Sequence, residues 1–211
     1  MKKIIISVDG PAASGKEKIA KYISKKWKYK HLDSGIIYRR LAYILLKNKT
    51  NLKSKSEIKK IINQNIQISF RKSKILRSEK ISKIASEIAV HGYIRDYVNK
   101  YQRNFVKFNL INKYFVIDGR DIGSVVFKNA DLKLYIDVSE EIRAKRRYKQ
   151  LIDTGEKSIY RQILKDIKLR DKKDKNRINS PLVVPNGAFI IKNNGNFNNT
   201  IKQINILVSS L

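Results

Sequence analysis

Residues 3–16 read KIIISVDGPAASGK, and they predict how the sheet of this protein begins. The first part, residues 3–8, is short, apolar and β-branched, which predicts a buried strand that ends at Gly10. The sequence then matches the pattern G-x-x-x-x-G-K, and from Ile19 onward apolar residues recur every four positions, as on one face of a helix. A strand, a glycine-rich turn and a helix in this order predict a loop that binds phosphate groups.

The chemistry expected of this loop follows from its geometry. Its backbone N–H groups point inward, the helix adds the positive end of its dipole, and Lys16 can reach the outer phosphates of a triphosphate. Glu17 and Lys18 stand where a hydroxyl group that helps to hold Mg²⁺ is usual. The alternative is a glycine turn that only joins strand to helix. We expect the following residues to bind ATP: Gly10, Pro11, Ala12, Ala13, Ser14, Gly15, Lys16, Glu17 and Lys18.

Further strands and helices alternate along the rest of the chain. Apolar runs and period-two alternation predict strands at 31–34, 66–70, 114–117, 132–136 and 188–191, with 74–76 pairing with 66–70 as a small hairpin. Helices are predicted at 35–47, 57–63, 82–108 (in two pieces broken near Gly92), 139–152, 158–175 and 198–207. This alternation predicts an α/β fold in which helices flank a central parallel sheet.

Composition limits the class of protein. A chain of 211 residues can bury one core with a small inserted lobe, so we expect a single domain over 1–211. It has no cysteine and no run of about 20 apolar residues, which favours a cytoplasmic protein that has no contact with membranes. The formal charge of +29 indicates a polyanionic partner or, alternatively, a lysine bias spread over the whole chain without a specific partner.

Four stretches carry a resemblance to a known family. They are HLDSGIIYR at 31–39, KIASEIA at 83–89 with Arg95 beyond it, IDGRDIGSVVF at 117–127, and RDKKDKNR at 170–177. Together with the phosphate loop, they resemble the bacterial cytidylate kinases, which are nucleoside monophosphate kinases with a P-loop NTPase fold. The resemblance runs in order from Ile4 to Val184, most of the chain.

The resemblance implies an activity and a division of the chain. Members of the family transfer the γ-phosphate of ATP, which is bound with Mg²⁺, to CMP or dCMP. The products are ADP and CDP or dCDP. It implies a nucleoside-monophosphate-binding insert at about 48–108 and a lid at about 143–175. The segment 48–78 is shorter than the insert usual in bacterial members, so we expect this lobe to be reduced. We expect a monomer whose partners are ATP and CMP, with no specific nucleic acid.

The resemblance also implies roles for single residues. Matching the motifs assigns the CMP phosphate to Ser34, Arg39, Arg120 and Arg177, the cytosine to Ser86, Arg95 and Asp121, and the ribose to Arg170 and Asp174. Arg143, Arg146 and Arg147 resemble lid arginines, and the residues expected to act in catalysis are Lys16, Arg39, Arg120, Arg146, Arg147 and Arg177. Asp118 resembles the acid that orders Mg²⁺ through water.

Other interpretations of these residues stay open at this point. Asp33 and Ser34 could cap the helix that follows them, Asp118 could be a structural turn carboxylate, and 170–177 could be a solvated helix face. At the level of function, the alternatives are a degenerate kinase fold that binds nucleic acid through its basic surface, and a P-loop kinase for another acceptor such as UMP.

Overall fold

The computed structural model describes residues 2–64, 73–153 and 155–211. The chain divides into two compact units. The first unit comprises Met1–Leu32 together with Val106–Leu211, and the second comprises Asp33–Phe105.

A five-stranded sheet forms the centre of the first unit. Its strands lie in the order β2-β3-β1-β4-β5, and β1 is parallel to β3 and to β4, as β4 is to β5. The strands are β1 (Ile4–Asp9), β2 (Lys30–Asp33), β3 (Tyr114–Gly119), β4 (Leu132–Asp137) and β5 (Phe189–Lys192). The structure thus confirms the predicted α/β fold and the predicted strands at 3–8, 31–34, 114–117, 132–136 and 188–191.

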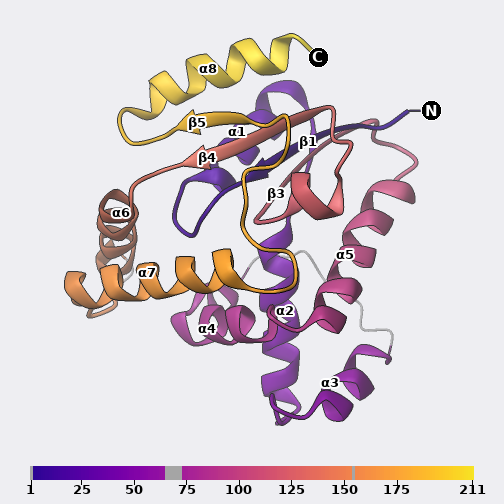
Figure 1. The fold of residues 1–211 in the computed structure, drawn as a ribbon, viewed down its shortest axis with the longest axis vertical. Coiled ribbons are helices and arrows are strands. Elements are labelled where there is room, and N and C mark those ends of the chain that lie inside the picture. Colours follow the sequence, from indigo (N-terminus) through magenta and orange to yellow (C-terminus); the bar gives the residue numbers. More distant parts are fainter. Residues whose placement is uncertain (1, 65–72, 154) are drawn as a thin grey trace. The chain divides into compact units, whose positions relative to one another are not determined.

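Two helices pack on one face of this sheet. They are α1 (Lys16–Trp27) and α8 (Phe197–Ser209), which appear beside β1, β4 and β5 in Figure 1. Their apolar side chains share one buried cluster with the strands. The apolar face that the sequence of α1 predicts packs into this cluster. Ile19, Ala20 and Ile23 are buried, while most of the lysines of α1 are exposed.

A second pair of helices follows β4. They are α6 (Glu140–Asp153) and α7 (Tyr160–Asn176), and they pack on each other through a small apolar cluster of Ala144, Leu151, Ile163 and Ile167. The buried positions of α7 are Ile163, Ile167, Asp171 and Asp174, so its inward stripe changes from apolar to acidic along the helix. The buried carboxylates in the second half of α7, Asp171 and Asp174, therefore require positively charged partners.

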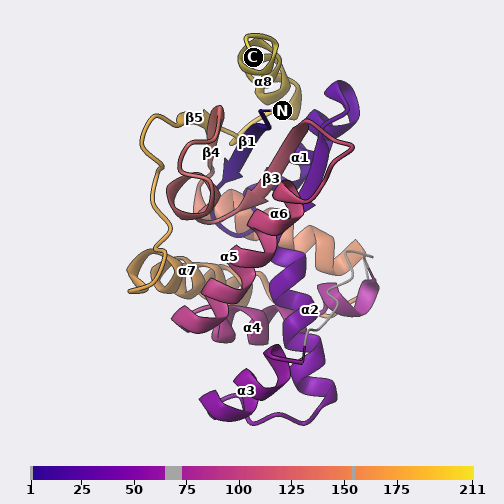
Figure 2. The ribbon, with the colours of Figure 1, turned by 90° about the vertical axis from the view of Figure 1, so that its right-hand side faces the viewer.

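The second unit is helical in its described part. Its elements are α2 (Ser34–Lys47), α3 (Lys55–Ile62), the short 3₁₀ helix η1 (Lys74–Arg77), α4 (Glu79–Ile88) and α5 (Gly92–Lys107, whose last two residues fall in the first unit). Figure 2 shows α3 at the end of α2. The expected break of the helical segment near Gly92 is confirmed.

The prediction that residues 74–76 form the second strand of a hairpin is wrong. Residues 74–76 belong to the 3₁₀ helix η1, in which Leu76 is buried. The local sequence KIL has an apolar pair without a strict alternation, and burial of Leu76 among helices decides its structure. The predicted strand 66–70 lies outside the described residues.

Within the described residues, no helix is long and apolar enough to cross a membrane.

The core of the first unit gives a prediction about stability. Leu134 on β4 is fully buried in the cluster shared with α1 and α8, whereas Leu110 is 91% exposed. We expect Leu134→Ala to lower the free energy of unfolding by about 2–5 kcal/mol, because it leaves a cavity in a packed core. Leu110→Ala is the matched control and should change it by less than about 0.5 kcal/mol. Urea denaturation measures both, and equal effects would contradict the described core.

Candidate active site

The phosphate loop joins β1 to α1 and has an unusual backbone, in which a left-handed alanine stands between two glycines of positive φ. Three of its residues have positive φ angles: Gly10 at 154°, Ala13 at 58° and Gly15 at 88°. A Cβ on Gly10 would lie 2.7 Å from the carbonyl oxygen of Ile136, so only glycine fits there. The Lys16 ammonium donates to the carbonyl of Pro11 at 3.0 Å, within the loop itself. The loop therefore has the conformation and the cation that an anion site requires.

Side chains from outside the loop hold its carbonyl groups. Arg146 on α6 donates to the carbonyls of Ser14 at 3.5 Å and Asn193 at 2.7 Å. The amide of Asn193, which follows β5, donates to the same Ser14 carbonyl at 2.9 Å and accepts from Thr200 at 3.0 Å. Burial lowers the pKa of Arg146. Two side chains from outside the loop thus hold the carbonyl of Ser14.

Glu17 and Lys18, the unusual residues of the motif, have partners on the helices. Glu17 forms an ion pair with Lys21 at 2.9 Å, one turn further along α1. The Lys18 ammonium lies over the ring of Phe197 on α8, 3.8 Å from its centre. Both side chains thus have electrostatic partners outside the loop.

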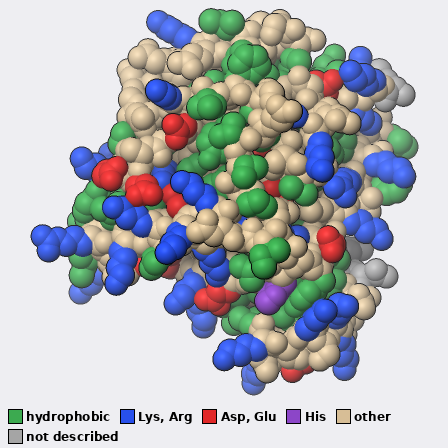
Figure 3. All heavy atoms as spheres, in the orientation of Figure 1, with side chains coloured by type: hydrophobic (Ala, Val, Ile, Leu, Met, Phe, Trp, Pro, Cys, Tyr) green, Lys and Arg blue, Asp and Glu red, His purple; other side chains and the backbone are tan. Residues whose placement is uncertain are grey.

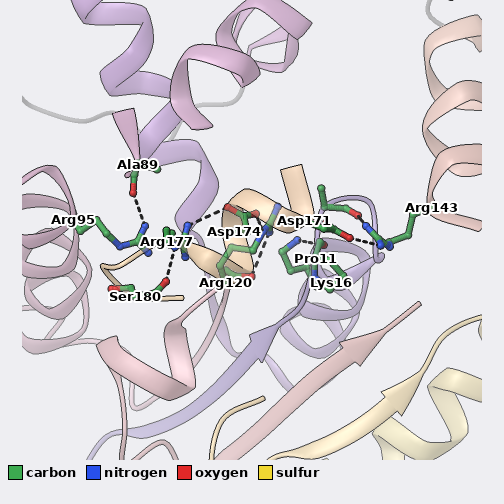
Figure 4. Close-up of polar contacts among 12 residues, drawn as sticks. Pro11, Lys16, Ala89, Arg95, Arg120, Arg143, Asp171, Asp174, Arg177 and Ser180 are labelled. Atoms are coloured by element: carbon green, nitrogen blue, oxygen red, sulfur yellow. Dashed lines mark hydrogen bonds and ion pairs between the residues drawn. The ribbon is translucent and has the colours of Figure 1, made fainter. Parts of the chain in front are cut away.

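The carboxyl end of β3 leads into a network of two partly buried arginines and one buried carboxylate, seen in Figure 4. Arg120 donates to one oxygen of Asp174 at 3.1 Å, and Arg177 donates to the other at 3.2 Å. Arg177 also donates to the carbonyl of Ser180 at 2.6 Å. Burial raises the pKa of Asp174, but the Arg120, Arg170 and Arg177 guanidinium groups outweigh it and hold the pKa below its ordinary value. Asp174 is therefore an anion that orients two cations.

Asp121 lies next to this network and begins a single turn of π-helix, η2 (Ile122–Val126). Asp9, the last residue of β1, holds this turn in place: its two carboxylate oxygens accept from the N–H groups of Ile122 at 2.8 Å and Gly123 at 2.7 Å. Turns of π-helix occur frequently at functional sites. Burial raises the pKa of Asp9 to about 7, although the two N–H groups lower it.

Asp118, the expected Mg²⁺-ordering acid, forms a pair with a histidine. Its Oδ1 lies 2.6 Å from Nε2 of His31 on β2, and both side chains are largely buried. Within the described residues, no group of three or more His, Asp or Glu side chains could hold a metal ion. Asp118 is therefore held by His31 at the carboxyl end of β3.

The remaining predicted residues belong to the second unit. Asp33 caps α2 by accepting from the N–H of Ile36 at 3.2 Å, and it also accepts from Arg39 at 3.2 Å. The capping interpretation therefore holds for Asp33, while Ser34 is buried as the first residue of the helix. Nε of Arg39 is buried and has no hydrogen-bond partner among the described residues.

Arg95 also lies in the second unit, on α5. It is 2% exposed, donates to the carbonyl of Ala89 at 3.0 Å, and lies 5.8 Å from the ring centre of Tyr38. Ser86 is partly buried on α4.

The structure thus brings together one part of the predicted set within the first unit. Arg120, Arg170, Asp174 and Arg177 form one charged group, and the phosphate loop with Arg146 forms a second. Arg147 is only partly buried and donates to Gln150 on its own helix at 3.0 Å. The residues Ser34, Arg39, Ser86 and Arg95 belong to the second unit.

Sequence reasoning missed Asp9, Asp171 and Asn193. Asp9 and Asn193 could have been found, because each stands at the carboxyl end of a predicted parallel strand, where ligand sites gather. Asp171 stands inside a charge run and gave no separate signal.

The fold and this site define a class of protein. A parallel sheet with a glycine-rich phosphate loop between β1 and α1, and with arginines held around that edge, is the arrangement of a P-loop kinase.

Two solved structures share the fold. A protein of Thermus thermophilus has a TM-score of 0.52 at 14% identity and covers 100% of this chain and 99% of its own. A gluconokinase of Sinorhizobium meliloti 1021 has a TM-score of 0.51 at 11% identity and covers 98% and 92%.

Sequence comparison shows the family within this class. The family model for cytidylate kinase matches residues 6–208. A cytidylate kinase of Rickettsia africae is 42% identical over 186 residues, which are 88% of this chain and 82% of that relative. The chain belongs to the cytidylate kinase family.

The raised pKa of Asp9 predicts a pH dependence of stability. In the unfolded chain its pKa is 3.8, whereas the folded protein keeps the proton until about pH 7. Between these values only the folded state holds this proton, so Asp9 removes about 1.4 kcal/mol of unfolding free energy for each unit by which the pH rises. We expect Asp9→Asn to abolish this slope. Urea denaturation between pH 4.5 and 7.5 measures it, and parallel curves for variant and wild type would contradict it.

Proposed function

We propose that this chain transfers the γ-phosphoryl group of ATP to the phosphate of CMP or dCMP. The observation that supports this most is the pairing of Arg120 and Arg177 on Asp174 in the same unit as the phosphate loop. Each of these arginines comes from a motif that resembles cytidylate kinases, and together they concentrate positive charge. Arginine suits this role because its planar fork binds two phosphate oxygens at once.

Phosphoryl transfer requires the protein mainly to align the donor and acceptor phosphates and to place positive charge around the transferred group. Phosphoryl transfer passes through a loose transition state with donor and acceptor oxygens in line. An acceptor phosphate is already ionised near pH 7, so no general base is needed. The chain then has to hold two anions end to end and exclude water.

On the donor side, we assign the triphosphate to the loop from Gly10 to Lys18. Its N–H groups would bind the phosphates, and the Lys16 ammonium would leave the Pro11 carbonyl to reach them. Mg²⁺ bound to the ATP phosphates would neutralise part of their charge, with Asp118 ordering a water of its shell. Arg146 and Arg147 on α6 would add positive charge near the transferred group.

On the acceptor side, we assign the CMP phosphate to Arg120 and Arg177, with Arg39 and Ser34 from the second unit. Arg39 has a buried Nε that needs an acceptor, as a bound phosphate would provide. Asp174 would hold the ribose with Arg170 in addition to orienting the two arginines.

For the base, we assign the reading of cytosine to Asp121 together with Arg95 and Ser86. The exocyclic amine of cytosine is a donor, and a carboxylate is a fitting acceptor for it. The two bonds that Asp9 accepts from η2 would keep Asp121 in a fixed position.

The nucleic-acid alternative is less favoured by the surface. Figure 3 shows Lys and Arg side chains spread over the visible face, with acidic and apolar side chains between them. A nucleic-acid site is expected to gather its basic residues on one face or along one helix. On this face the basic side chains form no single patch, which favours the kinase over the nucleic-acid alternative.

A coupled assay of ADP formation tests the proposed function. With Mg·ATP we expect turnover with CMP and dCMP at least about tenfold more efficient than with UMP or AMP. Lys16→Met should reduce kcat by roughly 100-fold, because the transferred charge loses its cation. Lys25→Met, at an exposed position of α1, is the control and should keep wild-type rates. No turnover with any nucleotide, together with salt-sensitive RNA binding, would favour the nucleic-acid alternative instead.

Replacing Asp121 tests how the base is read. Asp121→Ala should lower kcat/KM for CMP by roughly 10- to 100-fold, because it removes a charge-assisted hydrogen bond to the cytosine amine. The low activity with UMP should stay unchanged, so the preference for cytosine disappears. Asp96→Ala, exposed on α5, serves as the control. An equal loss with CMP and UMP would assign Asp121 a structural role.

A further inference from the structure

Arg143 on α6 is a buried arginine whose guanidinium group is fully engaged by the protein. It is 2% exposed. Its Nε donates to the carbonyl of Val138 at 3.0 Å, one terminal nitrogen donates to the carbonyl of Ala12 at 3.3 Å, and the other donates to Asp171 on α7. Moving this group onto a phosphate would break all three bonds and leave Asp171 as a buried, uncompensated charge. The contacts therefore assign Arg143 a different task from that of a mobile lid arginine.

One of these bonds reaches into the phosphate loop. Ala12 is followed by Ala13, whose φ of 58° is left-handed and costs an L-residue about 1–2 kcal/mol. The peptide between them is planar and trans, so its C=O and its N–H point in opposite directions. By holding the Ala12 carbonyl, Arg143 also fixes the direction of the Ala13 N–H. This N–H is one of the donors from which a phosphate loop is built.

Asp171 in turn holds Arg143. It is 3% exposed, and its second oxygen, Oδ1, has no hydrogen-bond partner within the described residues, so the pair with Arg143 is its main compensation. Asp171 and Asp174 are neighbours on the inward stripe of α7. In Figure 4 one of them faces Arg143 and the other faces Arg120 and Arg177. The single helix α7 thus carries the carboxylate that holds Arg143 and the carboxylate that holds Arg120 and Arg177.

We infer that Arg143 is a positioning residue for ATP, which Asp171 anchors and which keeps the Ala12–Ala13 peptide of the phosphate loop in its anion-binding orientation. This inference rests on the proposed function, because it assigns the loop to ATP. It gives Arg143, which is buried, the loop alone as its task. Arg146, which is only partly buried and also bonds the Ser14 carbonyl, and Arg147 remain assigned to the transferred group.

Two variants test the inference through the affinity for ATP. Arg143→Lys keeps the charge, but a single ammonium cannot reach acceptors that lie on Val138, Ala12 and Asp171 in three directions. We expect KM for ATP, and Kd for a non-hydrolysable ATP analogue measured without CMP, to rise about tenfold. Asp171→Asn should raise both about threefold. KM for CMP should stay within about twofold of wild type in both variants.

Two further variants separate positioning from simple stabilisation. Lys168→Ala removes another ion pair between these helices, Lys168 with Glu140 at 3.8 Å, which lies at the surface. It should leave the ATP affinity unchanged. The double variant Arg143→Lys with Asp171→Asn should weaken ATP binding no more than Arg143→Lys alone, because both act through one link.

The outcomes distinguish this inference from the proposed function. An Arg143→Lys variant that melts at a lower temperature but binds the ATP analogue as wild type does would overturn the inference, and so would equal losses for ATP and CMP. If Asp171→Asn fails to fold, Arg143→Lys decides alone. A wild-type protein that binds the analogue but does not phosphorylate CMP would overturn the proposed function, whereas the analogue titrations would still decide the role of Arg143.

Discussion

The carboxylates buried on α7 require compensation, and the arrangement of the site depends on this requirement. A buried carboxylate without a partner costs several kcal/mol, so Asp171 and Asp174 are stable only with arginines beside them. Asp174 is shared by Arg120 and Arg177, which lie 57 positions apart in the sequence and are brought together at this carboxylate. These ion pairs therefore hold two cations beside each other, and the proposed function assigns the CMP phosphate to them.

The parallel sheet sets where these groups meet. Strands β1, β3, β4 and β5 run in the same direction, so their carboxyl ends deliver Asp9, Arg120 and Asn193 to one edge. The phosphate loop begins at this edge and contains a left-handed alanine. Its carbonyl groups are held by side chains from α6 and from the end of β5, and such external bonds offset the strain of the loop.

Sequence could predict the parts of this site that are local. The phosphate loop and the strands follow from short patterns, because a turn or a strand end is decided by neighbouring residues. Arg120 is expected only from the resemblance to cytidylate kinases. The burial of Arg143 could not be predicted, since Arg143, Arg146 and Arg147 look alike on a polar helix and only tertiary contacts make one of them buried. Residues 74–76 show the same limit, because packing among helices decided their conformation.

The proposed function requires one chain to hold an adenine and a cytosine nucleotide with their phosphates in line. A single ligand in which adenosine and cytidine are joined through five phosphates tests it most directly, by calorimetric titration. We expect this ligand to bind at least about 100-fold more tightly than either a non-hydrolysable ATP analogue or CMP alone, because the second nucleotide binds within the same molecule. An affinity equal to that of the ATP analogue alone would contradict it.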